Sequence, residues 1–102
     1  MNDIKVVTIC GSMKFSKEMM REAAKLQIKE GYAVIQCVYN INEVKCDGYN
    51  PENLGKIHRK KIEISDAIYI VNVEGYIGES TKKEIEYARL IGKEILFMEP
   101  VV

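Results

Sequence analysis

Residues 4–15 read IKVVTICGSMKF, an apolar run followed directly by a glycine turn. The run 4–10 is rich in β-branched residues, as is typical of a strand buried on both faces of a parallel sheet. It ends at Gly11, and helix-forming residues follow from Ser16 onward. The stretch therefore predicts a strand, a turn and a helix in immediate succession, which is the repeating unit of α/β folds.

The alternation of strands and helices continues along the chain. Helices are expected at residues 16–30, 53–64 and 80–91, further strands at residues 32–38, 67–73 and 94–98, and a loop before Pro51. Ser16 is the expected N-cap of the first helix, and Gly31 and Gly92 are the expected helix stops. We therefore expect a single doubly wound α/β domain over residues 1–102, Rossmann- or flavodoxin-like, with about four parallel strands in the order 2-1-3-4 and helices on both faces.

The composition argues against several classes of function. The chain has 102 residues, of which 47% are hydrophobic and 29% charged, so it suits one domain with a modest core. Fifteen basic and fifteen acidic residues give zero formal charge, which argues against nucleic acid or an anionic membrane as partner. No apolar run approaches about 18 residues and the start MNDIKVV lacks a signal-peptide core, so we expect a soluble, cytoplasmic protein.

The cysteines do not form a recognisable motif. Cys10, Cys37 and Cys46 are an odd number without CxxC spacing, and His58 is the only histidine of the sequence. This pattern argues against a disulfide framework and against a cysteine or histidine zinc site. We expect neither a metal nor a cofactor.

The position of a ligand site follows from the expected topology. Doubly wound sheets bind ligands beyond the carboxyl ends of the strands, where the strand order reverses. Here that crevice would be lined by residues 11–15, residues 72–78 and the first turn of the last helix. Gly11 allows close approach, Ser12 offers a hydroxyl and Lys14 a cation. The same residues would serve equally well as a plain strand-to-helix turn.

Glu84 lies in an unusual place on the last helix. In GESTKKEIEYARLIGK, residues 78–93, a rotation of about 100° per residue puts Glu84 between Ile91 and Ala88 on the apolar face. One interpretation is a capping box, because Thr81 and Glu84 have the T-x-x-E spacing, in a cap worth on the order of 1 kcal/mol. The other is a carboxylate that faces an open crevice as a nucleophile or base. The spacing does not choose between them.

His58 raises a similar choice on the second helix. It falls on the apolar side, about 40° from Leu54 and from Ile62. A single histidine in such a place is more often a packed helix residue than a catalyst. The run HRKK at 58–61 indicates a solvated helix face, because aromatic residues and overall basicity that would suit nucleic acid are missing. Asp66, just before the third strand, is expected at a helix end or strand entry.

Three segments, taken in order, carry a family resemblance. They are CGSMKF at 10–15, SDAIYIVN at 65–72 and ESTKKEIEYARLIGKEI at 79–95. The chain resembles the nucleoside 2-deoxyribosyltransferase-like superfamily over nearly its whole length, and is most similar to its small members, including 2′-deoxynucleoside 5′-monophosphate N-glycosidases. The family pattern is matched by Ser80, Thr81, Glu84, Tyr87, Ala88, Gly92 and Lys93.

The resemblance implies roles for individual residues. Glu84 matches the glutamate that attacks C1′ of the deoxyribose as the base leaves, which is chemistry suited to a carboxylate. The residues implied to bind the sugar or its 5′ substituent are Gly11, Ser12, Lys14, Gly78, Ser80 and Thr81. Where these enzymes usually carry an aspartate that assists base departure, this chain has His58, whose imidazole can act as a general acid near neutral pH. The family also implies a homodimer.

These observations support competing hypotheses. The first is an N-glycosidase or deoxyribosyltransferase that acts on a small-molecule nucleoside or nucleotide. The second is a non-catalytic nucleotide-binding or sensing module of the same fold. Flavin binding would rest on topology alone, and the turn after the first strand lacks a hydroxyl-rich phosphate cradle.

Overall fold

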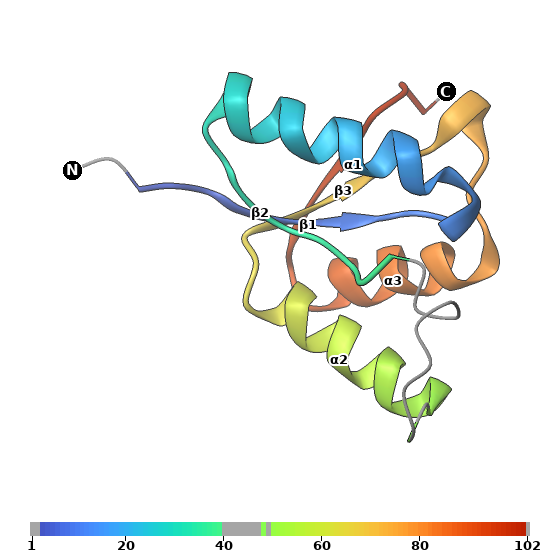
Figure 1. The fold of residues 1–102 in the computed structure, drawn as a ribbon. Coiled ribbons are helices and arrows are strands. Elements are labelled where there is room, and N and C mark those ends of the chain that lie inside the picture. Colours follow the sequence, from blue (N-terminus) through green and yellow to red (C-terminus); the bar gives the residue numbers. More distant parts are fainter. Residues whose placement is uncertain (1–2, 40–47, 49, 102) are drawn as a thin grey trace.

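The sheet has the predicted topology. The computed structural model describes residues 3–39, 48 and 50–101, and within them four parallel strands form one sheet. The strands are β1 (Val6–Cys10), β2 (Ala33–Ile35), β3 (Ala67–Ile70) and β4 (Glu94–Phe97). Their order is β2-β1-β3-β4, so the expected order 2-1-3-4 is confirmed (Figure 1).

Helices cover both faces of the sheet, as expected. Helix α1 (Ser16–Lys25) lies on one face, and α2 (Pro51–Glu63) and α3 (Glu79–Leu90) lie on the other (Figure 1). One apolar cluster under α2 and α3 contains Cys10, Ile62, Ile68, Ile70, Ile85 and Ala88. The second cluster, under α1, contains Ile9, Met19, Ala23, Leu26 and Val71. In the described part of the chain, no helix has the length and apolarity needed to cross a bilayer.

The start of α1 differs from the prediction. Ser16 is its first residue and has helical dihedral angles, φ −55° and ψ −38°, so it is not the N-cap. A 3₁₀ turn over Met13–Phe15 precedes it, in which the Phe15 amide donates to the Ser12 carbonyl at 2.9 Å. The turn already satisfies the backbone that a serine cap would have served. A π-helical turn, Leu26–Glu30, ends the helix at Gly31, whose φ of 70° confirms the predicted stop.

Other boundaries move by a few residues. The second strand is shorter than the expected 32–38, and the third ends at Ile70 rather than at residue 73. Helix α2 begins before residue 53, because Pro51 occupies its first turn and the Asn50 side chain accepts a hydrogen bond from the Glu52 amide at 3.0 Å. Most of the loop expected before Pro51, residues 40–47 and 49, lies outside the described residues.

Buried hydroxyls join the end of α2 to the central strand. The Oγ of Ser65 donates to the Lys61 carbonyl at 2.7 Å and accepts from the Oγ1 of Thr8 at 2.6 Å, and the Thr8 Oγ1 lies 3.2 Å from the same carbonyl. Beside them the Val6 amide donates to the Asp66 carboxylate at 2.8 Å, so Asp66 acts at a strand entry as predicted. Because Thr8 and Cys10 are two apart on one strand, they face the same side of the sheet. The hydroxyl pair therefore sets how α2 passes over Cys10.

Truncation of the core below α2 and α3 tests this packing. Ile68→Ala should lower the free energy of unfolding by roughly 3 kcal/mol, because Ile68 is fully buried and would leave a cavity. Ile28→Ala is the matched control, since Ile28 is exposed and should change stability by only about 0.5 kcal/mol. Urea unfolding followed by circular dichroism measures both, and equal effects would contradict the assigned core.

Candidate functional site

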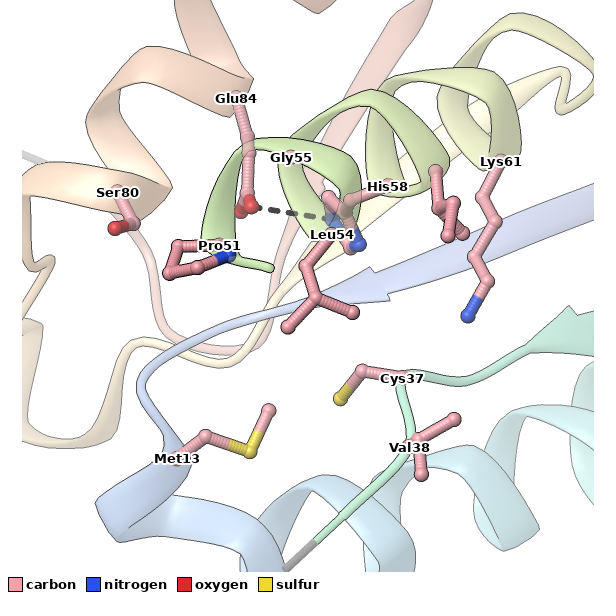
Figure 2. Close-up of a pocket in the computed structure, with 11 residues that line it drawn as sticks. Met13, Cys37, Val38, Pro51, Leu54, Gly55, His58, Lys61, Ser80 and Glu84 are labelled. Carbon is pink, nitrogen blue, oxygen red and sulfur yellow. Dashed lines mark ion pairs between the residues drawn. The ribbon is translucent and has the colours of Figure 1, made fainter. Parts of the chain in front are cut away.

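A pocket opens beyond the carboxyl ends of β1 and β2, beneath α2 and α3. Its volume is about 470 Å³. Met13, Val38 and Leu54 give it apolar walls, and His58 and Glu84 supply polar groups (Figure 2). Pockets of this size, mostly apolar with a few polar side chains, are typical of small-molecule sites. A smaller pocket of about 170 Å³ shares His58 and Glu84 and adds the cationic side chains of Arg59 and Lys83.

The pocket lies only partly where topology predicted it, since Met13 and Ser80 line it as expected. Residues 72–78 were expected to line it, but among the described residues α2 and the chain after β2 take that place. Asn72 is instead paired with the C-terminal segment: its amide group donates to the Glu99 carbonyl at 3.0 Å and accepts from the Glu99 amide at 2.9 Å. The Glu74 amide donates to the Glu99 carboxylate. These bonds occupy the polar groups after β3, and the pocket lies on the side of α2.

Glu84 and His58 meet at the polar end of the pocket. The His58 Nε2 lies 3.2 Å from the Glu84 Oε2, and the two side chains are 17% and 22% exposed (Figure 2). Helix α3 begins at Glu79 with Gly78 as its N-cap, so Thr81 is not a capping residue. The capping-box interpretation is therefore wrong, because Glu84 lies beyond the third helical position and its carboxylate contacts another helix. Glu84 faces the pocket, as the alternative proposed.

Cys10 is the residue that the sequence reasoning missed. It ends β1, is 1% exposed, and its Sγ lies 3.4 Å from the same Nε2 of His58. Its position just before the Gly11 turn was the available signal, because residues at the carboxyl ends of parallel strands line ligand sites. Cys37, which follows β2, lines the pocket itself, whereas Cys10 is buried and touches the pocket residue His58. The odd cysteine count did not distinguish these two from ordinary core thiols.

Burial shifts the pKa of each group in this cluster. It raises the pKa of Glu84 to about 7. It lowers the pKa of His58 to about 4, with a smaller effect from the positive charge of Lys61. Burial, followed by the negative charge of Glu84, also raises the pKa of the Cys10 thiol. At neutral pH the contact thus joins a neutral imidazole to a carboxyl group that is partly protonated.

Most of the predicted substrate-binding residues do not reach the pocket. Of that set, all within the described part of the chain, Ser80 lines both pockets. Lys14 lies outside them, with its Nζ 3.5 Å from the centroid of the Tyr76 ring. Thr81 is buried in α3, and Gly78 caps that helix. The cationic side chains that line a pocket together with Glu84 are, in the described part of the chain, those of Lys61, Arg59 and Lys83.

Gly11 and Ser12 serve the turn rather than the pocket. A Cβ on Gly11 would lie 3.3 Å from the Met19 sulfur and 3.3 Å from the Val71 carbonyl oxygen, which is tighter than ordinary packing. The Ser12 carbonyl accepts the hydrogen bond that closes the 3₁₀ turn. The prediction that these residues contact a ligand thus receives no support from the pocket lining, although their turn holds Met13 at its wall.

Comparisons with known proteins do not place the chain in a family. No family model matches it, and no curated protein matches it significantly.

The raised pKa of Glu84 predicts pH-dependent stability. The folded state holds the Glu84 proton up to about pH 7, whereas the unfolded chain releases it near 4.5, so the wild type loses stability as pH rises from 4.5 to 7. The buried His58 has the opposite effect, since its lowered pKa makes the stability rise between about pH 4 and 6.5. Because the wild type and a Glu84 variant both contain His58, this effect cancels when the two are compared. Glu84→Gln should therefore gain about 3 kcal/mol over the wild type between pH 4.5 and 8, at about 1.4 kcal/mol per pH unit of pKa difference.

Urea unfolding at half-unit pH steps measures this difference. Glu86→Gln, an exposed change on the same helix, is the control and should follow the wild type. A constant difference between Glu84→Gln and the wild type across this range would show that Glu84 is not desolvated in the folded state.

Proposed function

We propose that this protein cleaves or exchanges the N-glycosidic bond of a 2′-deoxynucleoside or its 5′-monophosphate. One observation carries the proposal: the Glu84 carboxylate lies at the polar end of an otherwise apolar pocket, 3.2 Å from an imidazole that can exchange its proton. The resemblance of residues 79–95 to the nucleoside 2-deoxyribosyltransferase-like superfamily assigns the nucleophile to the same glutamate.

The pair can supply both charges that the reaction requires. Transfer of one proton from the Glu84 carboxyl to His58 leaves a carboxylate and an imidazolium in contact. The carboxylate attacks C1′ and forms a glycosyl ester, while the C1′–N bond breaks and its electron pair goes to the base. The imidazolium gives its proton to the departing base. Water, deprotonated by the imidazole, then releases deoxyribose and restores Glu84, whereas a second base in place of water gives transfer.

The two pockets fit the two ends of such a substrate. The apolar walls formed by Met13, Val38 and Leu54 suit the flat face of a nucleobase. A 5′-phosphate is assigned to the smaller pocket, where Arg59 and Lys83 lie near Ser80 in the first turn of α3. Cations and a helix N-terminus both favour an anion. These residues replace Lys14 as the phosphate ligands.

Release of base from deoxynucleosides and their monophosphates tests the proposal directly. The purified protein should liberate base from at least one member of a panel, with 5′-monophosphates favoured by Arg59 and Lys83. Glu84→Ala should abolish release, and Glu86→Ala on the exposed side of α3 should retain it. Chromatography of the products provides the measurement. Absence of release across the panel, or full activity in Glu84→Ala, would refute the proposal.

A second substrate distinguishes a role of His58 as general acid from a role in positioning Glu84. His58→Asn should lower the rate by about 10²- to 10⁴-fold on ordinary purine deoxynucleosides, because the base must then depart without a proton. It should have little effect on 7-methyl-2′-deoxyguanosine, whose base is already cationic and leaves neutral. Equal losses on both substrates would assign His58 to positioning Glu84.

A non-catalytic nucleotide-binding module is the second candidate. The observation that favours it is the state of Glu84, which is partly protonated at neutral pH and in contact with His58, so the free nucleophile is not the resting form. Under this alternative, deoxynucleotides should raise the melting temperature in a saturable manner with no base released. The same panel, followed by thermal shift and chromatography together, distinguishes the two.

A further inference from the structure

Two groups converge on one nitrogen of His58. The Cys10 Sγ lies 3.4 Å and the Glu84 Oε2 lies 3.2 Å from the same Nε2. A ring nitrogen carries either one proton or one lone pair, so it cannot satisfy both neighbours with strong hydrogen bonds. A nucleophile–histidine–carboxylate triad would place the carboxylate on the other ring nitrogen. The arrangement is therefore not that of a proton relay through the ring.

The three donor atoms instead surround a common point. The Cys10 sulfur, a His58 nitrogen and a Glu84 oxygen all lie within 4.8 Å of one another. We propose that they form a binding site for a zinc ion, with the fourth ligand position open to the pocket that His58 and Glu84 line. This inference goes beyond the proposed glycosidic reaction and does not depend on it.

The two separations that involve the His58 nitrogen fit tetrahedral zinc. Bond lengths of about 2.3 Å to sulfur and about 2.0–2.1 Å to nitrogen and oxygen, at tetrahedral angles, place sulfur and nitrogen about 3.5 Å apart and nitrogen and oxygen about 3.3 Å apart. The observed distances are 3.4 Å and 3.2 Å. Because the ligands come from β1, α2 and α3, and buried hydroxyls fix α2 on β1, the site is largely formed before metal arrives.

Charge and ligand type favour zinc over other divalent cations. A thiolate from Cys10 and a carboxylate from Glu84 neutralise Zn²⁺ when His58 is neutral, so the buried complex carries no net charge. The thiol proton leaves to solvent as the Zn–S bond forms. Thiolate and imidazole ligands bind Zn²⁺ far better than Mg²⁺ or Ca²⁺, which prefer oxygen. Three protein ligands with an open fourth position are typical of zinc sites that bind water or a ligand.

Zinc binding and nucleophilic use of Glu84 exclude each other. The ion would occupy the Nε2 of His58 and an oxygen of Glu84, which are the atoms that the glycosidic reaction uses. A measurement of metal binding without nucleotide therefore tests this site whether or not the glycosidic activity exists.

Cobalt substitution in a single-thiol background provides the test. A chain carrying Cys37→Ser and Cys46→Ser retains Cys10 as its sole cysteine, and it should be stripped with a chelator before use. Titration with Co²⁺ should give one equivalent bound, with the strong visible bands of a tetrahedral ion and a near-ultraviolet thiolate-to-cobalt band. Zn²⁺ should then displace Co²⁺ and remove both signals.

Variants of Cys10, His58 and Glu84 show whether these residues bind the metal. Adding Cys10→Ser should remove the thiolate band, and His58→Asn or Glu84→Gln should weaken binding by more than about 100-fold, because even loss of outer partners costs about 10- to 100-fold. Glu86→Gln is the control for Glu84→Gln and should bind as the background does. Circular dichroism confirms that each variant folds. Failure to bind Co²⁺ or Zn²⁺ at micromolar concentration, or binding that survives Cys10→Ser or His58→Asn, would overturn the site.

Discussion

The hydroxyl pair of Thr8 and Ser65 is the constraint on which the site depends. Thr8 is fully buried in the central strand, where an unpaired hydroxyl would be unfavourable, and its partner closes the end of α2. Through this pair Thr8 is linked to the Lys61 carbonyl, which determines how α2 crosses the sheet. His58 lies three residues before Lys61 on α2, and Cys10 lies two residues after Thr8 on β1. Satisfying one buried polar group thus brings the imidazole and the thiol into contact.

Desolvation then determines the chemistry of the cluster. A carboxylate, an imidazole and a thiol are buried together near an apolar pocket, and each loses hydration that favours its charged form. At neutral pH the imidazole and the thiol are neutral and the Glu84 carboxyl is partly protonated, unless a bound group compensates the charges. A substrate that develops positive charge at C1′ would compensate the Glu84 carboxylate, and a zinc ion would compensate the carboxylate and the thiolate together. The proposed substrate and the proposed zinc ion would both use the Glu84 oxygen and the His58 nitrogen, so the two could not be bound at once.

Much of the site could be predicted from local patterns, and the misses have a common cause. Periodicity placed Glu84 and His58 on the apolar sides of their helices, and both reach the pocket. The predicted loop contacts were less successful: Lys14 stacks on Tyr76, and Gly11 is needed for packing. A turn beside a strand end resembles a ligand loop in sequence whether or not it faces the ligand. The direction of its side chains depends on neighbours far along the chain.

The sequence by itself determined the order and type of elements and the helix faces, because hydrophobic periodicity and helix-stop glycines act over a few residues. Only the tertiary structure decided that Glu84 contacts His58 instead of capping α3 and that Cys10 contacts the same imidazole. It also decided that the Asn72 side chain is hydrogen-bonded to the Glu99 backbone. Zinc motifs are recognised in sequence by closely spaced ligands, whereas Cys10 and His58 are separated by 48 positions. Parallel strands and crossover helices bring such distant residues together, and no local pattern records that proximity.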